Sequence, residues 1–303
     1  MPYTFSSTTI LAVFCVVFLG QIYLLSIYFP GKIIMRVRYV LENFPPENYP
    51  RLYPDFYPGY MAEAYRKLGW YRGISTATAI LGIVILASML VSGYQPSLKG
   101  GDEIFVLFYT MLQALPLISL EIKEFKKYRL MRSTYGAKVR SAELAPRRLF
   151  DFISPFYAAL AVVMYALWIT AFLNARGFDD PQVGEVYATL FLITGMNVAY
   201  AGWIARIMYG KKLDPYKAPA DQLKQIGVTV KTLVFSSIGI SLFLILAQAA
   251  DQYNLEVFDP PLASLYMQLC MAFSLGIALK MQDLNDIDFD VYRDEKAVPP
   301  KEA

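Results

Sequence analysis

The chain has 303 residues, of which 56% are hydrophobic and 17% are charged, and its formal net charge is +3. This composition is too apolar and too poor in charge for a typical soluble domain. Histidine is absent, which excludes the usual catalytic zinc sites, His-ligated haem and the Ser–His and Cys–His nucleophile pairs.

Seven apolar stretches are long enough to cross the hydrocarbon core of a bilayer, which takes about 20 helical residues. They run over residues 8–29, 74–93, 104–121, 153–174, 186–207, 229–250 and 263–281. The third contains Pro116, where we expect a kink. The sequence therefore predicts an all-α fold, a polytopic membrane protein built as a seven-transmembrane-helix bundle.

The loops between these spans alternate sharply in Lys and Arg. The first, third and fifth loops, with their flanks, hold 22 of the 28 basic residues, whereas the second and fourth hold only Lys99 and Arg176. Short basic loops stay in the cytoplasm, so we expect the N-terminus outside and the C-terminus in the cytoplasm. Anionic membrane lipids are expected on the basic face, and nucleic acid is not, because these basic residues form no compact module.

The first loop carries Tyr-Pro three times between residues 49 and 58. Proline removes a backbone donor and fixes φ, so we expect turns or extended chain there, followed by a helix over 61–70. One interpretation is a docking surface for a partner protein, because rigid aromatic rings suit such contacts. It would consist of Tyr49, Tyr53, Tyr57 and Tyr60. The alternative is an interfacial loop whose tyrosine rings lie along lipid headgroups.

The third loop ends with Arg147 and Arg148, just before the fourth span. Arginine can hold a phosphate through two parallel hydrogen bonds, which makes these residues a candidate lipid-headgroup site. The alternative is ordinary charge that sets the topology.

Residues 283–303 are predicted to be an acidic, mobile cytoplasmic tail beyond a single transmembrane domain of residues 1–282. The tail carboxylates are those of Asp283, Asp286, Asp288 and Asp290. Clustered carboxylates can bind Mg²⁺ or Ca²⁺, but the glycine and the distal glutamate of a calcium loop are missing. We therefore expect a solvated acidic segment and no metal site.

Inside the spans the polar residues are neutral, and the amides among them are Gln21, Gln113, Asn197 and Gln268. Unpaired amides are costly in hydrocarbon, so these side chains should face the interior of the bundle. They could bind a neutral or amphiphilic ligand, or they could join helices by hydrogen bonds. No Asp, Glu, Lys or Arg lies near the centre of any span, which disfavours proton pumps and ion-coupled transporters.

Two weaker patterns concern how the spans are arranged. Residues 135–181 resemble residues 209–260 in the spacing of short motifs, which indicates either an internal repeat or chance similarity. Cys15 and Cys270 lie at similar depth from the outer face, so we expect the first and seventh spans to be neighbours with their thiols close together.

These features predict no catalytic residue and no cofactor. The leading hypothesis is a non-enzymatic, multi-pass protein of the cytoplasmic (inner) membrane that acts as an accessory, scaffold or assembly subunit, with a protein partner or as a homo-oligomer. One alternative is a channel, transporter or binding protein for a neutral or lipid-like solute. Another is an enzyme acting on lipid phosphates through Arg147, Arg148 and the tail carboxylates.

Overall fold

The computed structural model describes residues 7–94, 103–134, 147–176, 183–210, 214–253, 255–281 and 283–293. No strand occurs among these residues. Seven helical stretches in the described ranges are long and apolar enough to cross a membrane. The prediction of an all-α chain with seven such helices is therefore confirmed, and the fold is that of a multi-pass membrane protein.

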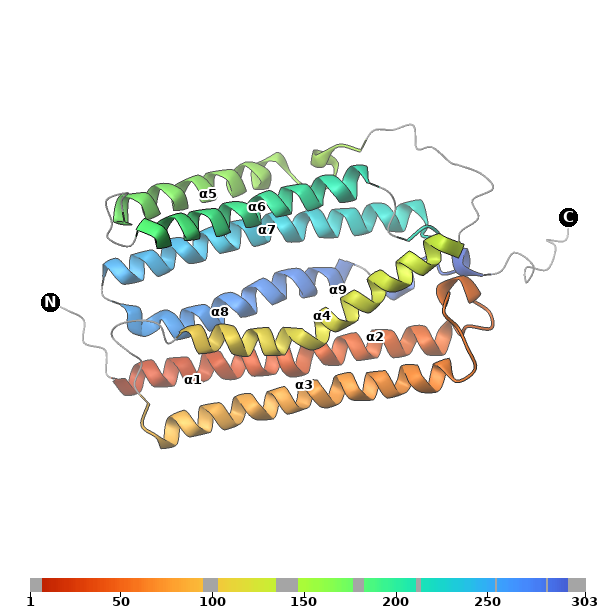
Figure 1. Ribbon diagram of the computed structural model, residues 1–303, viewed down its shortest axis with the longest axis horizontal. Helices are drawn as coiled ribbons and strands as arrows, with labels where there is room; N and C mark the ends of the chain where they lie inside the picture. The colour runs from red at the N-terminus through yellow and green to blue at the C-terminus, as the bar shows by residue number, and fades with distance from the viewer. Residues whose placement is uncertain are drawn as a thin grey trace, which may run out of the picture.

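The first span is continuous from α1 (Ser7–Tyr23) through the π-helical turn η1 (Leu24–Tyr28) into α2 (Phe29–Asn43). The next two spans are α3 (Tyr60–Val91) and α4 (Glu103–Thr134). Figure 1 shows α4 changing direction partway along its length, and Pro116 lies inside it, as a proline kink requires.

The second half of the chain supplies the other four spans, and the last of them again contains a π-helical turn, η5. Their bounds are α5 (Pro155–Arg176), α6 (Val183–Tyr209), α7 (Pro219–Gln252), α8 (Asp259–Met271), η5 (Ala272–Gly276) and α9 (Ile277–Met281).

Several helices continue well beyond the apolar stretches that predict them. The expected helix over 61–70 and the expected span over 74–93 are one helix, α3, which begins after Gly59 in the left-handed conformation (φ 94°). Similarly, α4 continues to Thr134 and α7 begins at Pro219. Hydropathy marks where a helix meets lipid, whereas a helix ends only where proline, glycine or a cap stops it.

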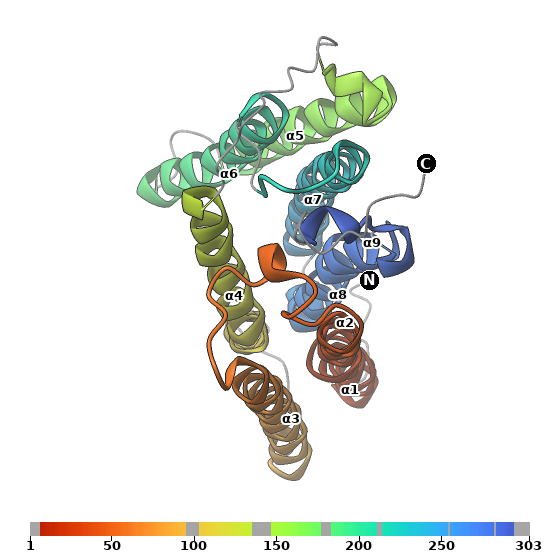
Figure 2. The ribbon, with the colours of Figure 1, turned by 90° about the vertical axis from the view of Figure 1, so that its right-hand side faces the viewer.

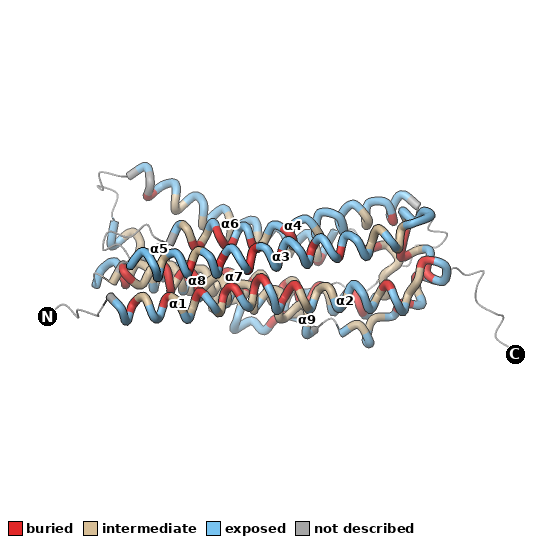
Figure 3. Tube along the Cα trace, turned by 90° about the horizontal axis from the view of Figure 1, so that it is seen from below, coloured by how far each residue is buried: buried red, intermediate tan, exposed pale blue. Residues whose placement is uncertain are grey.

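The helices form two groups, and each group packs around its own apolar core. Helices α1, α3, α4 and α8 pack around one cluster of buried apolar side chains, and α5, α6 and α7 pack around another. Contacts between α7 and α8 join the groups, and Figure 2 shows this arrangement end-on. Buried positions recur as a narrow stripe along the helices, while exposed positions cover the outer turns (Figure 3). Such apolar outer faces suit contact with lipid chains.

One end of the bundle gathers the chain segments that flank the basic loops, and we call it the basic end. Residues 44–59, the end of α4, the start of α7 and residues 283–293 all lie there, whereas α1 begins at the opposite end (Figure 1). Lys99, Lys138 and Arg140 lie outside the described residues, as does part of the possible repeat over 135–181.

The first and seventh spans are neighbours, as predicted, because α1 packs along α8. The two thiols face different surroundings. Cys15 packs against the core of the first helix group, whereas Cys270 follows two residues after Gln268, which contacts Val17 of α1. Two residues correspond to about 200° around a helix. Cys270 therefore faces away from α1.

Gly82 is buried at the crossing of α1, α3 and α4. A Cβ atom there would lie 2.2 Å from the Tyr109 hydroxyl oxygen and 2.8 Å from a side-chain carbon of Ile22. Because Gly82 has no side chain, the Tyr109 hydroxyl can approach the backbone of α3 and donate to the Thr78 carbonyl at 2.9 Å. Glycine is therefore required here for close approach rather than for backbone freedom.

We expect Gly82→Ala to lower the stability of the purified protein by about 1–3 kcal/mol, the usual cost of overpacking a core. Thermal unfolding in detergent measures this loss. Combining it with Tyr109→Phe should cost less than the two single changes together, since Phe lacks the oxygen that meets the new methyl group. Gly73→Ala on the same helix is the control, because a Cβ atom meets nothing within 4 Å there. Equal effects at both glycines would contradict this account.

Candidate functional site

A layer of amide and hydroxyl side chains joins three spans in the middle of the first helix group. The Gln21 side chain is fully buried; its Nε2 donates to Thr110 Oγ1 at 2.8 Å and to Gln113 Oε1 at 2.9 Å. Its Oε1 accepts from the Ser264 hydroxyl at 2.5 Å. Gln21 therefore hydrogen-bonds both α4 and α8, and we call this set of side chains the amide layer.

Two further glutamines extend the amide layer. Gln113 Nε2 donates to Ser26 Oγ at 2.8 Å, and Ser26 lies in the π-helical turn η1. Gln268 Nε2 donates to the Val17 carbonyl at 2.9 Å. Since π-helical turns add a residue to a helical turn, η1 changes which side chains of the first span face α4.

The fourth predicted amide, Asn197, does not join this layer. It lies on α6, where its Oδ1 accepts from the Ser237 hydroxyl of α7 at 2.5 Å and its Nδ2 donates to Ile193 O at 2.9 Å. The structure thus brings together Gln21, Gln113 and Gln268 and leaves Asn197 in the other helix group. All four amides bond neighbouring protein groups, an arrangement that holds helices together.

The Tyr-Pro loop folds inward over the basic end. Tyr49 and Tyr53 are buried, with exposed fractions of 5% and 4%, whereas Tyr60 is half-buried and Tyr57 is exposed. The Tyr53 hydroxyl donates to the Phe44 carbonyl at 2.8 Å. Only Tyr57 and part of Tyr60 are therefore accessible to a partner, and Tyr49 and Tyr53 are core residues of this loop.

Residues 283–293 of the predicted tail pack against this loop and do not extend into solvent. The Phe289 ring stacks on Phe44, with 3.8 Å between ring centroids. The Arg293 guanidinium donates to the Tyr49 hydroxyl at 2.9 Å and lies over its ring. This packing forms a cap over the basic end, made from the end of α2, residues 44–60, the start of α3, the end of α4 and the tail segment.

Carboxylates just before α7 and in its first turn fasten the tail to the cap. The Tyr292 hydroxyl donates to Asp214 Oδ2 at 2.5 Å, and Asp221 Oδ2 accepts from the Asp288 backbone N–H at 3.0 Å. Burial, and the carboxylate of Asp214, raise the pKa of Tyr292. Burial also lowers the pKa of Lys217, whose ammonium donates to Gln225 at 2.9 Å. Burial is thus the main influence on both groups.

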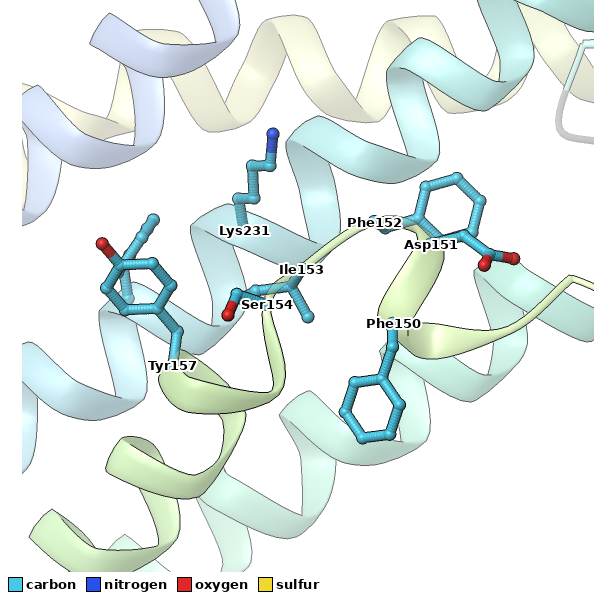
Figure 4. A pocket seen from close by; sticks show the side chains of 8 residues that line it. Phe150, Asp151, Phe152, Ile153, Ser154, Tyr157 and Lys231 are labelled. Atoms are coloured by element: carbon cyan, nitrogen blue, oxygen red, sulfur yellow. The ribbon is translucent and has the colours of Figure 1, made fainter.

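The two predicted headgroup arginines lie beside a shallow groove at the start of α5. Arg147 Nη1 donates to the Met208 carbonyl at 3.5 Å, and Arg148 is exposed. The groove has a volume of about 260 Å³ and lies between η3 (Leu149–Asp151), the first turn of α5 and α7. Lys231 and Asp151 are among the side chains that line it (Figure 4). Neither Arg147 nor Arg148 lines it.

The carboxylates of the tail have their own partners. Asp283 and Asp288 accept from backbone N–H groups two residues further on, and Asp286 and Asp290 lie near Lys224 and Arg293. Within the described ranges, no group of three or more potential metal ligands gathers. These residues therefore stabilise local turns and surface ion pairs.

No family model, curated protein or solved structure matches this chain.

The main feature that the sequence reasoning missed is the docking of residues 284–292. The signal was the interruption of an acidic segment by Leu284, Ile287, Phe289 and Tyr292. Apolar residues at such short intervals favour a packed segment over a solvated one.

We expect Gln21→Leu to lower stability by about 1–2 kcal/mol, because it leaves Gln113, Thr110 and Ser264 short of a partner. Thermal unfolding in detergent is the measurement. Adding Gln113→Leu should cost less than the sum of the single changes, since the two amides bond each other. Gln248→Leu, which removes one donor to the Ala171 carbonyl, is the control. Fully additive losses would argue against a shared network.

We expect Tyr292→Phe to release the tail segment, because Asp214 loses a buried donor at a cost of about 1–3 kcal/mol. Hydrogen exchange of residues 283–293 measures the release. Tyr65→Phe is the matched control, since this tyrosine of α3 is 38% exposed and lies outside the apolar cluster that packs the tail.

The raised pKa of Tyr292 gives the same contact a pH dependence. A raised folded-state pKa stabilises docking fully below the unfolded value of about 10 and loses that effect as pH rises further. Wild-type protection should therefore fall above about pH 10, and protection independent of pH there would contradict the assignment.

Proposed function

We propose that this chain is a non-enzymatic, multi-pass protein of the cytoplasmic membrane that acts as an accessory, scaffold or assembly subunit. In this proposal the basic end lies in the cytoplasm and α1 begins outside, in keeping with the distribution of Lys and Arg. The protein would bind another membrane protein or a second copy of itself.

The observation that carries the proposal is the folded cap at the basic end. Buried aromatic rings from the first loop and the tail hold it together, so its outer residues are presented on a firm base. Phe56 and Tyr57 are exposed, with fractions of 47% and 41%. The Tyr57 hydroxyl donates to Glu63 of α3, which restrains its ring. Restrained, exposed aromatic side chains lose little entropy on binding a partner.

The amide layer supports the same proposal. Its donors and acceptors are used between α1, α4 and α8, which favours a structural role over solute binding at this depth. An enzyme acting on lipid phosphates has less support, since the tail carboxylates cap their own turns or pair with Lys224 and Arg293.

A second candidate function is a binding protein for a lipid-like ligand. One observation favours it: a groove of about 480 Å³ lined by Lys32, Arg36 and Lys280 lies near the basic end.

Photocrosslinking in membranes of the native host tests the leading proposal. A photoreactive residue replacing Phe56 in the full chain should give an adduct of defined mass with one protein. Further substitution of Tyr57→Ala should reduce the yield, since a partner would contact both rings. The same probe at Val91, which is 91% exposed at the opposite end, is the control.

A tagged second copy distinguishes a homo-oligomer from a different partner, and either result supports the proposal. Adducts with lipid alone at Phe56, combined with purification of the chain as a monomer from crosslinked membranes, would overturn it.

A further inference from the structure

A groove near the basic end lies between α2, the end of α9 and the first residues of the tail. Its volume is about 480 Å³. The side chains that line it include Lys32, Met35, Arg36, Tyr39, Lys280 and Asp283. Its two helical walls come from the first and last spans, and Figure 2 shows α9 next to α2 in the end-on view.

The walls of the groove are fixed by hydrogen bonds between elements far apart in the sequence. Arg36 Nη1 donates to the Leu279 carbonyl at 3.1 Å. The Tyr39 hydroxyl donates to Asn285 Oδ1 at 3.3 Å. These contacts hold α2 against both the end of α9 and the tail, so the groove is part of the folded structure.

Lys32 and Lys280 are placed where the spans leave the hydrocarbon. No charged residue precedes Lys32 in the chain, and none lies between Asp259 and Lys280. Each lysine is therefore the first charge after an apolar span. Lipid phosphates occupy this boundary layer between hydrocarbon and water. Two spans thus present a cation to the same groove.

The charge of the groove suits an anion. Lys32, Arg36 and Lys280 contribute three positive charges, and Asp283 contributes one negative charge. Lys32 and Lys280 are exposed, and the Lys32 ammonium lies over the Tyr28 ring at 5.8 Å. The groove beside α5 differs, because Lys231 is its single cation and Asp151 offsets it. Of these two grooves, only the one between α2 and α9 carries a net positive charge.

The groove also has an apolar side that a free anion would not need. Met35, Leu279 and Leu284 line it, and Met35 is 56% exposed. A ligand that combines a phosphate with hydrocarbon chains would cover these side chains while its phosphate met the two lysines.

We propose that this groove binds the phosphate of an anionic phospholipid from the leaflet at the basic end. Lys32 and Lys280 are the residues that contact the phosphate, and Arg36 holds the two walls together. The site is separate from Arg147 and Arg148, and it does not depend on whether the protein acts as a scaffold.

Native mass spectrometry of the full chain in non-ionic detergent tests the proposal. Phosphatidylglycerol added to the protein should bind as one tightly held molecule, and phosphatidylcholine should bind more weakly. Lys32→Gln with Lys280→Gln should weaken phosphatidylglycerol binding by about tenfold, because two of the three cations are lost. Lys126→Gln with Lys231→Gln removes the same charge elsewhere and should leave binding unchanged.

Two further measurements keep the proposal open to refutation if the double variant is unstable. Asp283→Asn removes the opposing carboxylate and should tighten phosphatidylglycerol binding. Inorganic phosphate in large excess should not displace the lipid, since it cannot cover the apolar side of the groove. Displacement by phosphate would instead indicate a free-anion site. Equal loss in both double variants would indicate non-specific attraction, and either result overturns the proposal.

Discussion

Hydrocarbon offers no hydrogen-bond partners, and this constraint organises the first helix group. A glutamine in a membrane span must find its donors and acceptors within the protein, because an unpaired amide there is costly. Gln21 meets this requirement by bonding α4 and α8 at once. The first and last spans are thereby held together, and the groove near the basic end exists because these two spans run side by side.

Outside the hydrocarbon, burial of aromatic rings replaces amide pairing as the main stabilising interaction. The cap contains Tyr49, Tyr53, Phe44, Phe289 and Tyr292, from segments more than 200 residues apart in the chain. Proline in the first loop favours the turns that direct Tyr49 and Tyr53 inward. Tyr49 and Tyr53, which the sequence suggests as part of a contact surface, are therefore buried in the cap. Phe56 and Tyr57 remain exposed.

The spans were predictable because lipid imposes a length and a composition on every crossing helix. Pro116 predicted the kink in α4, and the similar depth of Cys15 and Cys270 predicted that the first and seventh spans are neighbours. The grouping of Gln21, Gln113 and Gln268 without Asn197 did not, since hydropathy does not reveal which face of a span meets which neighbour. The π-helical turn at Leu24–Tyr28 adds to this difficulty, because it shifts the helical phase after Gln21.

The role of the tail was missed for a different reason. Counting charge favours a solvated segment, yet a few apolar residues outweigh that tendency once they can pack against an apolar surface. The apolar residues of the tail favour packing, but the surface they pack on comes from residues 44–60 and from Tyr216 just before α7, and the tail sequence does not reveal it. The paired groups Tyr292 and Asp214 are likewise recognisable only in three dimensions.

Contacts between segments far apart in the sequence have a consequence for biosynthesis. Arg293 contacts Tyr49 and Ser264 contacts Gln21 across more than 240 residues. During translation the first span and its aromatic loop cannot make these contacts until the segments that carry Ser264 and Arg293 have left the ribosome. Over that interval the nascent chain exposes surfaces that chaperones or insertion factors could recognise.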